Sequence, residues 1–496
     1  MMKLYSLLDE LTEKTVTGGA DIEITGITAD SRKVQKGFLF VAIAGNKEDG
    51  HRYVEHALRQ GAAAVVGKSV AELPGVVSIA VPDSRKAAAL LAEAFYEHPS
   101  RQLNVIGITG TNGKSSTLYL IRSILSAAGI SSSGIGTICY SVAGTTEAAK
   151  NTTPGPIDLS SSLRKALDAG HTHFVMEVSS HALHQFRVEA IRFAVAVYTN
   201  LSLDHLDYHA NMEDYFVSKR HLFELLSRNP QANCAVISAD DARGKDIAAA
   251  TQTRKLTFGI KNPADICARN IEIGASHTAF LASTPAGDFP VNLKLLGRHS
   301  VYNALAAAGV CLGLDIDVST IKQGLEQLEL VPGRFERVSE GQPFEVIVDY
   351  AHTPEAIKLL LESARSICKG KLIAVFGAGG DRDRSKRPEM GKLAASISDF
   401  SIVTSDNPRS EDPYRIALDI EIGFQKMGKE RGQHYLVIID RREAIEEALA
   451  TAETGDIVVI AGKGHETYQI FKDATVEFDD KAIARAWLQS MNKPEK

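Results

Sequence analysis

Residues 104–128, NVIGITGTNGKSSTLYLIRSILSAA, decide the fold of this chain. The first six residues are rich in Val and Ile and predict a buried strand; residues 110–116 predict a tight turn that opens an amphipathic helix. This layout is typical of a phosphate-binding loop. Gly110 and Gly113 let backbone N–H groups approach an anion, and the positive end of the helix points at it. Lys114 adds a mobile charge, and Ser115 offers a hydroxyl to Mg²⁺.

The spacing of this loop departs from the standard pattern. G-x-x-x-x-G-K-[ST] requires glycine at position 108, where this chain has Ile108. A plain glycine-rich turn between a strand and a helix is therefore an alternative interpretation. The preceding strand, the following helix and the Lys-Ser-Ser-Thr run favour a nucleotide phosphate.

Length and composition narrow the class of protein. The chain has 496 residues, too many for one core, and the usual size of domains predicts about three. With 44% hydrophobic and 23% charged residues it is ordinary for a soluble globular protein. A net charge of −6 gives no electrostatic case for nucleic acid or a membrane surface as a partner, so local basic residues must hold any anionic ligand.

Cysteine usage and the start of the chain bear on the compartment. The five cysteines show no C-x-x-C pair, which predicts buried free thiols in a reducing compartment and no cysteine zinc site. The first residues, MMKLYSLLDELTEK, do not form a signal peptide, and no apolar run of 18 residues follows. We therefore expect a cytoplasmic protein without membrane insertion.

Two breaks divide the chain into three expected domains. The break at residues 97–100 and the Pro-Gly-Arg run at 332–334 give domains at 1–98, 99–332 and 333–496. The first predicts a small α/β unit. Its polar loops at 29–32 and 46–51 are more often solvated turns than ligand sites. The third has strands EVIVD, KLIAVF, FSIVT, YLVII and DIVVIA between helices, which predicts a doubly wound parallel sheet and hence an α/β fold.

Several residues of the central third are candidates for a site. Glu177 ends a strand predicted at 173–178, where a Mg²⁺ ligand is expected, although a solvent-facing acid is the alternative. Residues 200–209 are dense in Asp and His and form either a cation site or a surface loop, without an HExxH zinc pattern. Lys219 lies on a helix predicted at 211–226, where a lysine is usually solvated. Asn303 precedes an Ala-rich helix predicted at 304–312 and is either a cap or a base contact.

The strand exits of the C-terminal third carry polar motifs at 350–352, 377–383, 405–409 and 462–466. Ligands of open α/β sheets bind outside the carboxyl ends of the strands, so these motifs predict a site at one edge. Arginine binds carboxylates bidentately, so the basic residues there indicate a carboxylate-bearing ligand, with a solvated loop as the alternative for Arg384. These basic residues are Arg382, Arg384, Lys386, Arg387 and Arg409.

Six motifs together resemble the Mur ligases of peptidoglycan synthesis over nearly the full chain. They are GTNGKSS (110–116), EVSSH (177–181), the run 200–209, PGR (332–334), DYAH (349–352) and GKGHE (462–466). The resemblance implies a UDP-sugar-binding N-terminal domain, a central ATP-binding domain with a mainly parallel sheet, and a Rossmann-like C-terminal domain for the incoming amino acid. It implies ATP-driven amide formation through an acyl phosphate on UDP-N-acetylmuramoyl-L-alanyl-D-glutamate. The motif DNPR (406–409) is similar to the one that marks meso-diaminopimelate as the added amino acid.

The resemblance also implies a role for individual residues. ATP would be bound by Gly110, Thr111, Asn112, Gly113, Lys114, Ser115, Ser116, Asn303, Arg334 and Asp349. Mg²⁺ would be held by Ser115, Glu177, His205 and Lys219, the last as a carbamylated lysine; Lys114, Glu177, His205 and Lys219 are the implied catalytic set. Ser300 departs from many relatives, which have Asn there.

The implied substrate contacts come from all three domains. The UDP-linked dipeptide would be bound by Ser31, Asn46, Lys47, Glu48, Asn151, Thr152, Thr153, Ser179, Gln185 and Arg187. Diaminopimelate would be bound by Arg387, Asp406, Asn407, Pro408, Arg409, Gly462 and Glu466, with arginine on its carboxylate and Glu466 on its distal ammonium. The partners implied are these small molecules, acting on a monomer, with hinge motion near Pro99 and Pro332.

Three alternatives remain at this stage. A lysine-adding ligase of the same family usually differs at 406–409. A folylpolyglutamate synthase shares the phosphate loop but lacks the N-terminal domain. A non-catalytic nucleotide-binding regulator has no need of Lys114, Glu177, His205 and Lys219 together.

Overall fold

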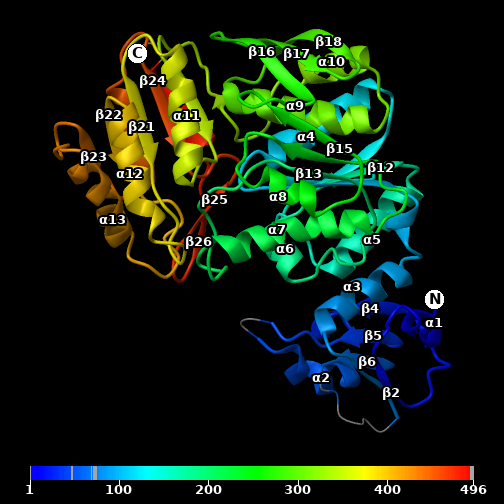
Figure 1. Ribbon diagram of the computed structural model, residues 1–496. Helices are drawn as coiled ribbons and strands as arrows, with labels where there is room; N and C mark the ends of the chain where they lie inside the picture. The colour runs from blue at the N-terminus through cyan, green and yellow to red at the C-terminus, as the bar shows by residue number, and fades with distance from the viewer. Residues whose placement is uncertain (1, 46–47, 69, 71–74, 492–496) are drawn as a thin grey trace.

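The structure is a computed structural model that describes residues 2–45, 48–68, 70 and 75–491. It contains three α/β units, each built on its own sheet (Figure 1). The N-terminal unit lies at one end, next to the central unit, and the C-terminal unit packs beside the central unit on another side. The α/β fold class predicted from the alternating strand and helix patterns is confirmed.

The N-terminal unit has a five-stranded sheet in the order β2-β7-β6-β5-β4, parallel except for β2. Its strands are β2 (Thr15–Thr17), β4 (Gly26–Thr28), β5 (Phe38–Val41), β6 (Ala64–Gly67) and β7 (Val77–Ala80), with the short pair β1 (Met2–Lys3) and β3 (Glu23–Ile24). Its helices are α1 (Leu4–Leu8), α2 (Val54–Arg59) and α3 (Ser84–Phe95). Apolar residues of α1 and α3 share one core with the sheet, and Ile157 of the central unit packs against it.

The central sheet has eleven strands in the order β11-β10-β9-β12-β8-β13-β14-β15-β16-β17-β18. They are β8 (Asn104–Thr109), β9 (Ser132–Ile135), β10 (Cys139–Val142), β11 (Thr145–Ala148), β12 (His173–Glu177), β13 (Phe193–Tyr198), β14 (Cys234–Ser238), β15 (Lys255–Gly259), β16 (Ile266–Ile273), β17 (Thr278–Thr284) and β18 (Gly287–Leu293). The seven strands from β9 to β16 are parallel, and the outer hairpins are antiparallel. The carboxyl ends of the parallel strands therefore meet at one edge.

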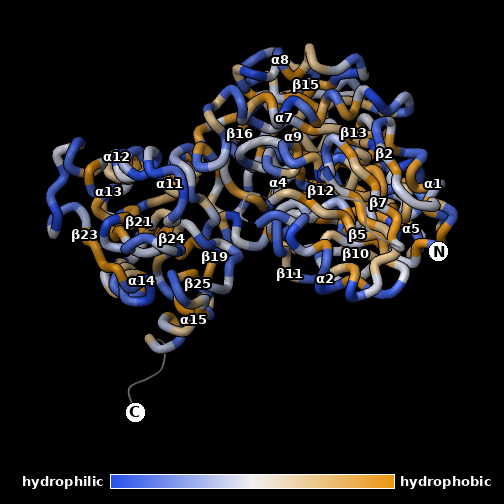
Figure 2. Tube along the Cα trace, turned by 90° about the horizontal axis from the view of Figure 1, so that it is seen from below, coloured by the Kyte–Doolittle hydropathy of each residue, from blue (hydrophilic) through white to orange (hydrophobic). Residues whose placement is uncertain are grey.

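Helices cover both faces of this sheet. They are α4 (Lys114–Ala127), α5 (Pro156–Asp168), α6 (Ser180–His184), α7 (Met212–Ser227), α8 (Gly244–Ala249), α9 (Arg298–Gly313) and α10 (Val318–Gln327). Because successive strand residues face opposite sides, Ile106 and Ile108 of β8 pack against α4 and α9, whereas Val105 packs toward α5 and α7. Figure 2 shows this burial as hydrophobic residues concentrated along the strands.

The C-terminal sheet has the order β19-β20-β24-β21-β22-β23 and is parallel except for β19. Its strands are β19 (Glu336–Arg337), β20 (Glu345–Asp349), β21 (Leu372–Phe376), β22 (Phe400–Val403), β23 (Tyr435–Val437) and β24 (Ile457–Ala461), followed by the hairpin β25 (Tyr468–Ile470) and β26 (Thr475–Glu477). The helices α11 (Pro354–Ile367), α12 (Lys386–Ile397) and α13 (Pro413–Lys426) cover one face, and α14 (Arg441–Ala450) and α15 (Asp480–Met491) cover the other.

The predicted elements agree with the structure except at some boundaries. The Ala-rich helix begins at Arg298 and not at 304, so Asn303 lies inside α9 and the cap interpretation is wrong. All five cysteines are free thiols, as predicted, but only Cys234 and Cys311 are buried. Within the described residues, no helix is both long and apolar enough to cross a bilayer.

Candidate active site

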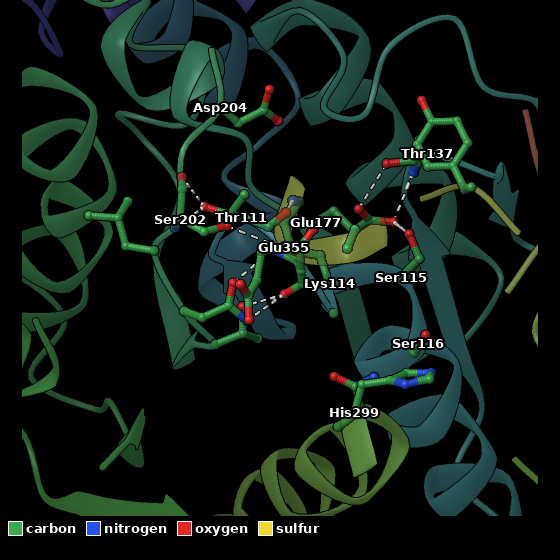
Figure 3. Close-up of a pocket in the computed structure, with 18 of the residues that line it drawn as sticks. Thr111, Lys114, Ser115, Ser116, Thr137, Glu177, Ser202, Asp204, His299 and Glu355 are labelled. Carbon is green, nitrogen blue, oxygen red and sulfur yellow. Dashed lines mark hydrogen bonds between the residues drawn. The ribbon is translucent and has the colours of Figure 1, made fainter. Parts of the chain in front are cut away.

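A cavity of about 700 Å³ opens where the strand exits of the central sheet face the C-terminal unit. The phosphate loop and Glu177 line it from the central sheet; Arg334, Asp349, Tyr350 and His352 line it from the C-terminal unit. Figure 3 shows Lys114, Ser115, Glu177 and Thr137 converging on one region of this cavity, with Asp204 on another. Residues far apart in the sequence therefore share one site.

The phosphate loop connects β8 to α4. Gly110 and Gly113 have φ values of +146° and +88°, and a Cβ on either would collide with Thr199 or with Asn303. Asn303 of α9 thus packs directly against the loop. The Lys114 ammonium group donates to the carbonyl oxygens of Gly110 at 2.9 Å and Thr111 at 2.8 Å. Burial lowers the pKa of Lys114, although Glu177 and Asp204 oppose the shift.

Glu177 stands at the carboxyl end of β12 and is 1% exposed, so the solvent-facing alternative is excluded. Its carboxylate accepts hydrogen bonds from the Ser115 hydroxyl at 2.7 Å and from the backbone N and the hydroxyl of Thr137, each at 2.9 Å. Carboxylate and hydroxyl oxygens suit Mg²⁺, which uses one or two carboxylates together with substrate phosphates. Among the described residues no group of three or more His, Cys, Asp or Glu is placed to hold a metal.

Lys219 of α7 is buried and is not a solvated surface charge. Its ammonium nitrogen lies 2.9 Å from the carbonyl oxygen of Gly110 and 4.3 Å from the ring centroid of Tyr215. Burial, followed by the neighbouring charge of Lys114, lowers the pKa of Lys219 well below its ordinary value. A neutral amine at this position is a nucleophile.

Residues 200–209, here called the Asp/His loop, cover the phosphate loop and are not a free surface loop. The backbone N of Thr111 donates to the carbonyl oxygen of Asn200 at 2.8 Å, and the backbone N of Asn112 donates to the Asn200 side chain at 3.0 Å. His205 lines the cavity, and burial lowers its pKa to about 3. The two ring nitrogens of His209 instead contact Ser180 at 3.0 Å and Asp214 at 3.2 Å, so both already have hydrogen-bond partners.

The first C-terminal strand exit reaches the phosphate loop. Arg334 donates to the Ser115 hydroxyl at 3.2 Å, and its guanidinium lies 4.6 Å from the ring centroid of Tyr350. Asp349 accepts from the backbone N of Phe335 and of Ala351, each at 2.7 Å. The structure therefore brings Asn303 and Arg334 to the phosphate loop, and Asp349 lines the same cavity.

The DNPR and GKGHE motifs form a second polar network. Asn407 donates to Glu466 at 2.9 Å and accepts from Lys463 at 2.9 Å, while Asp406 lies 3.8 Å from Lys463. Burial, reinforced by Asp406, raises the pKa of Glu466. Gly462 has a φ of +122°, and a Cβ there would collide with Asp406.

This network contacts the main cavity through Tyr350. The hydroxyl of Tyr350, which lines that cavity, donates to Glu466 at 3.4 Å. Pro408 and Arg409 line a separate hollow of about 440 Å³. Of the residues predicted to receive the amino acid, Glu466 is therefore connected to the cavity through Tyr350.

The basic residues of the C-terminal unit separate into two groups. Arg387 is completely buried, and its guanidinium pairs with Glu411 at 2.8 Å and Asp419 at 2.9 Å. Arg384 also pairs with Asp419, at 3.1 Å. Arg382, by contrast, lines the cavity. The structure thus gives Arg387 charge partners within its own unit, whereas Arg382 lines the cavity and pairs with Asp207 of the central unit at 3.3 Å.

Most residues predicted for the muramoyl-peptide end line the same cavity, namely Asn151, Thr152, Thr153, Ser179 and Arg187. Arg187 donates to the Thr153 carbonyl oxygen at 2.8 Å and to Gln185 at 2.7 Å, and Gln185 donates to Tyr208 at 3.0 Å. The residues predicted for the UDP end lie in the N-terminal unit. Ser31 is buried there, and Glu48 accepts from Tyr53 at 3.1 Å. Asn46 and Lys47 lie outside the described residues.

Some lining residues were missed from the sequence. Thr137, which holds Glu177, follows β9 in a stretch without a recognisable motif. Asp240 and Asp241 follow β14, and the Tyr302 hydroxyl donates to Asp240 at 2.7 Å. An acidic pair directly after a short apolar run is a sequence signal by which Asp240 and Asp241 could have been predicted. The Ser300 hydroxyl donates to the carbonyl oxygen of Leu296 at 2.8 Å, at the start of α9.

Comparisons with known proteins agree over the whole chain. Residues 23–102 match "Mur ligase family, catalytic domain", residues 108–311 match "Mur ligase middle domain", and residues 333–464 match "Mur ligase, glutamate ligase domain". A protein of Syntrophomonas wolfei named UDP-N-acetylmuramoyl-L-alanyl-D-glutamate--2,6-diaminopimelate ligase is 44% identical over 493 residues, 99% of this chain and 100% of the relative. One of Bacillus licheniformis with the same name is 44% identical over 98% of this chain and 99% of the relative.

Solved structures give the same result. A structure of a UDP-N-acetylmuramoyl-L-alanyl-D-glutamate--2,6-diaminopimelate ligase is 31% identical, covers 99% of both chains and has a TM-score of 0.68. A MurF ligase from Thermotoga maritima in complex with ADP is 20% identical, covers 94% of this chain and 96% of that chain, and shares the fold with a TM-score of 0.63. With relatives of 44% identity along nearly its whole length, this chain belongs to the Mur ligase family.

Proposed function

We propose that this chain is an ATP-dependent amide ligase that adds meso-diaminopimelate to UDP-N-acetylmuramoyl-L-alanyl-D-glutamate in cytoplasmic peptidoglycan precursor synthesis. The observation that carries the proposal is the single cavity shared by a phosphate loop and the strand exits of the C-terminal sheet. That arrangement suits the transfer of a phosphoryl group beside an amino acid. The names of the relatives support the choice of substrates.

The reaction has two steps. A carboxylate is a poor acyl donor because oxide would have to leave, so the γ-phosphoryl group of ATP first passes to the D-glutamyl carboxylate and ADP is released. The amine of diaminopimelate then attacks the acyl carbon, the bond to the phosphate oxygen breaks, and the surplus proton passes to solvent. Lys114 and the loop amides oppose the phosphate charge, so the task of the protein is positioning and electrostatics.

The residues around Glu177 fit a magnesium ion. Ser115, Glu177, His205 and a carbamylated Lys219 would hold Mg²⁺, which when bound would neutralise charge on the transferred phosphoryl group. The buried Glu177 carboxylate and the Ser115 hydroxyl, 2.7 Å apart, supply the oxygen ligands that this ion prefers.

The surroundings of Lys219 support its carbamylation. Its depressed pKa favours the neutral amine, which can add to the carbon of CO₂ and lose a proton to leave a carbamate. This reaction replaces a cation with an anion. A buried cation beside a metal site would repel the metal, whereas a carbamate oxygen would bind it.

We assign the substrates to domains as follows. The UDP end would lie on domain 1–98 at Ser31 and the loop 46–48, and the muramoyl peptide at 151–153, Ser179, Gln185 and Arg187 in domain 99–332. Diaminopimelate would be received by domain 333–496 through Arg387 and the DNPR and GKGHE motifs, with Arg387 and Arg409 toward a carboxylate. Arg382, which lines the cavity, is a further candidate for this contact. The working unit is a monomer.

The test is phosphate release by the purified protein with ATP, Mg²⁺ and the UDP-linked dipeptide, with meso-diaminopimelate and L-lysine offered separately. We expect turnover with diaminopimelate and at most a small fraction of that rate with lysine. Turnover with lysine alone would identify a lysine-adding ligase. Turnover with neither would contradict the ligase proposal and favour a nucleotide-binding regulator.

A further inference from the structure

The Asp/His loop is attached to the phosphate loop at its first residues. Besides the contacts of Asn200, the backbone N of Ser202 donates to the Thr111 hydroxyl at 3.0 Å, and that hydroxyl lies 3.3 Å from the Ser202 carbonyl oxygen. Asn112 donates from its side chain to the Ser202 hydroxyl at 3.3 Å. Figure 3 shows Ser202 against Thr111, with Asp204 beyond it. A displacement of the Asp/His loop would therefore also displace the phosphate loop.

The same loop is held by the C-terminal unit. The Lys386 ammonium group lies 3.5 Å from Asp204, and their side chains are only 5% and 9% exposed. A second, more exposed pair joins Arg382 to Asp207 at 3.3 Å. Lys386 is the first residue of α12, where the helix dipole disfavours a cation, and Asp204 is its ion-pair partner.

Asp204 in turn fixes the backbone of His205. Its carboxylate accepts a hydrogen bond from the His205 backbone N at 2.9 Å. His205 has a φ of +58°, a left-handed conformation that a residue with a side chain keeps only when its surroundings impose it. The Lys386–Asp204 ion pair thus connects the C-terminal unit to the carboxylate that holds the backbone of His205 in place at the cavity.

We infer that Lys386 is a positioning residue through which docking of the C-terminal domain organises the Asp/His loop, His205 and the phosphate loop for phosphoryl transfer. This inference rests on the proposed ligase function. Lys386 does not line the cavity as the described residues form it, whereas Asp204 and His205 do, so Lys386 acts through Asp204 and not on a substrate. Phosphoryl transfer thereby depends on the position of the C-terminal domain, which carries the incoming amino acid.

The test replaces Lys386 by methionine, which keeps the length of the side chain and removes its charge. Lys392→Met is the matched control, because Lys392 lies on the same helix and its pair with Glu389 is about half exposed, at 50% and 48%. With all substrates present, we expect Lys386→Met to lower kcat on the order of ten- to a hundredfold and to change the KM for diaminopimelate less than about twofold. Lys392→Met should match the wild type.

Hydrogen exchange gives a readout that needs no turnover. Amides of residues 200–209 and 110–113 should exchange faster in Lys386→Met than in the wild type or in Lys392→Met. If the wild type itself releases no phosphate, the proposed function fails, while the exchange comparison still tests the coupling. Unchanged exchange at both segments would overturn the inference.

The variant Asp204→Asn with Lys386→Met removes both charges of this ion pair, so neither partner is left buried without the other, and it serves even where Lys386→Met fails to fold. Its kcat should be no lower than that of either single variant, since both remove the same interaction. A wild-type kcat in the double variant would overturn the inference. So would a rise confined to the KM for diaminopimelate in Lys386→Met, which would make Lys386 a substrate contact.

Discussion

At the scale of single residues, the site is built around two lysines that the protein keeps out of water. Lys114 and Lys219 both donate to the carbonyl oxygen of Gly110 at 2.9 Å. Two ammonium groups this close repel each other, and burial adds to the cost of charging either one. A bound phosphate would offset the positive charge of Lys114, whereas loss of the proton would remove the charge of Lys219 and with it the repulsion.

Lys219→Ala is expected to reduce ligase activity by at least about a hundredfold, because removal of the proposed carbamate also removes a metal ligand. Short carboxylates such as acetate or formate should restore part of the activity, since they can fill the space with the same oxygen chemistry. Phosphate release measured with increasing carboxylate tests this. Wild-type activity without added carboxylate would reject the carbamate role.

Gly113→Ala is expected to weaken ATP binding. A Cβ at Gly113 would collide with Asn303, and the φ of +88° adds strain of about 1 kcal/mol for a residue with a side chain. Gly144→Ala is the matched control, with a φ of +81° and open space around its Cβ. We expect the KM for ATP to rise at least tenfold in Gly113→Ala only. An equal rise in both variants would show that strain alone is responsible.

At the scale of elements, the junction between the N-terminal and central units is organised by one buried carboxylate on α3. Glu93 accepts from the backbone N of Ser100 at 2.9 Å and from the Ser160 hydroxyl of α5 at 3.1 Å. The Ser100 hydroxyl in turn accepts from the backbone N of Arg192 at 3.1 Å. The break at residues 97–100 is therefore a hydrogen-bonded joint and not a loose linker.

Burial raises the pKa of Glu93 above its ordinary value, although its hydrogen bonds oppose the shift. Because the pKa of Glu93 is higher in the folded than in the unfolded state, its carboxyl group stabilises the fold at low pH. This stabilisation is lost as the pH rises through the folded pKa. The unfolding temperature of Glu93→Gln should therefore rise relative to that of the wild type as the pH is raised from about 4 to 7. Thermal unfolding across this range tests the sign. A difference that does not vary with pH would contradict it.

At the scale of the whole molecule, the proposed reaction takes place in a cavity that the central and C-terminal units line together. The C-terminal unit reaches the central unit through Arg334, Lys386 and Arg382, which contact Ser115, Asp204 and Asp207. These three contacts are polar, although Leu296 of the central unit packs into the hydrophobic core of the C-terminal unit. Relative motion of domains is expected where polar contacts make up much of an interface.

Binding of ATP and the UDP-linked dipeptide together should close the domains about the segments near Pro99 and Pro332. We expect small-angle scattering to show a smaller radius of gyration with both ligands than without them. Because Glu93 and Ser100 fasten the first segment, most of the change should come from the second. A radius of gyration that does not change would count against closure.

Much of the fold followed from local sequence patterns. Buried parallel strands read as Val- and Ile-rich runs, so the strands at 345–349, 371–376, 400–404 and 456–461 were predictable one by one. The start of α9 was missed because Arg298, His299 and Ser300 are not apolar, while Gly297 caps the helix without a side chain. The Lys114 loop and Glu177 were predictable because each directly follows a strand.

The sequence by itself determined the three α/β units, the phosphate loop and the family, because these depend on residues close together in the chain and on motifs at fixed spacing. Only the tertiary structure decided which polar residues face a common cavity. It buried Arg387 between Glu411 and Asp419, left Arg382 in the cavity, and set Lys386 against Asp204. The physical reason is that charge pairing and desolvation depend on the neighbours that packing supplies, and these lie up to hundreds of residues away along the chain.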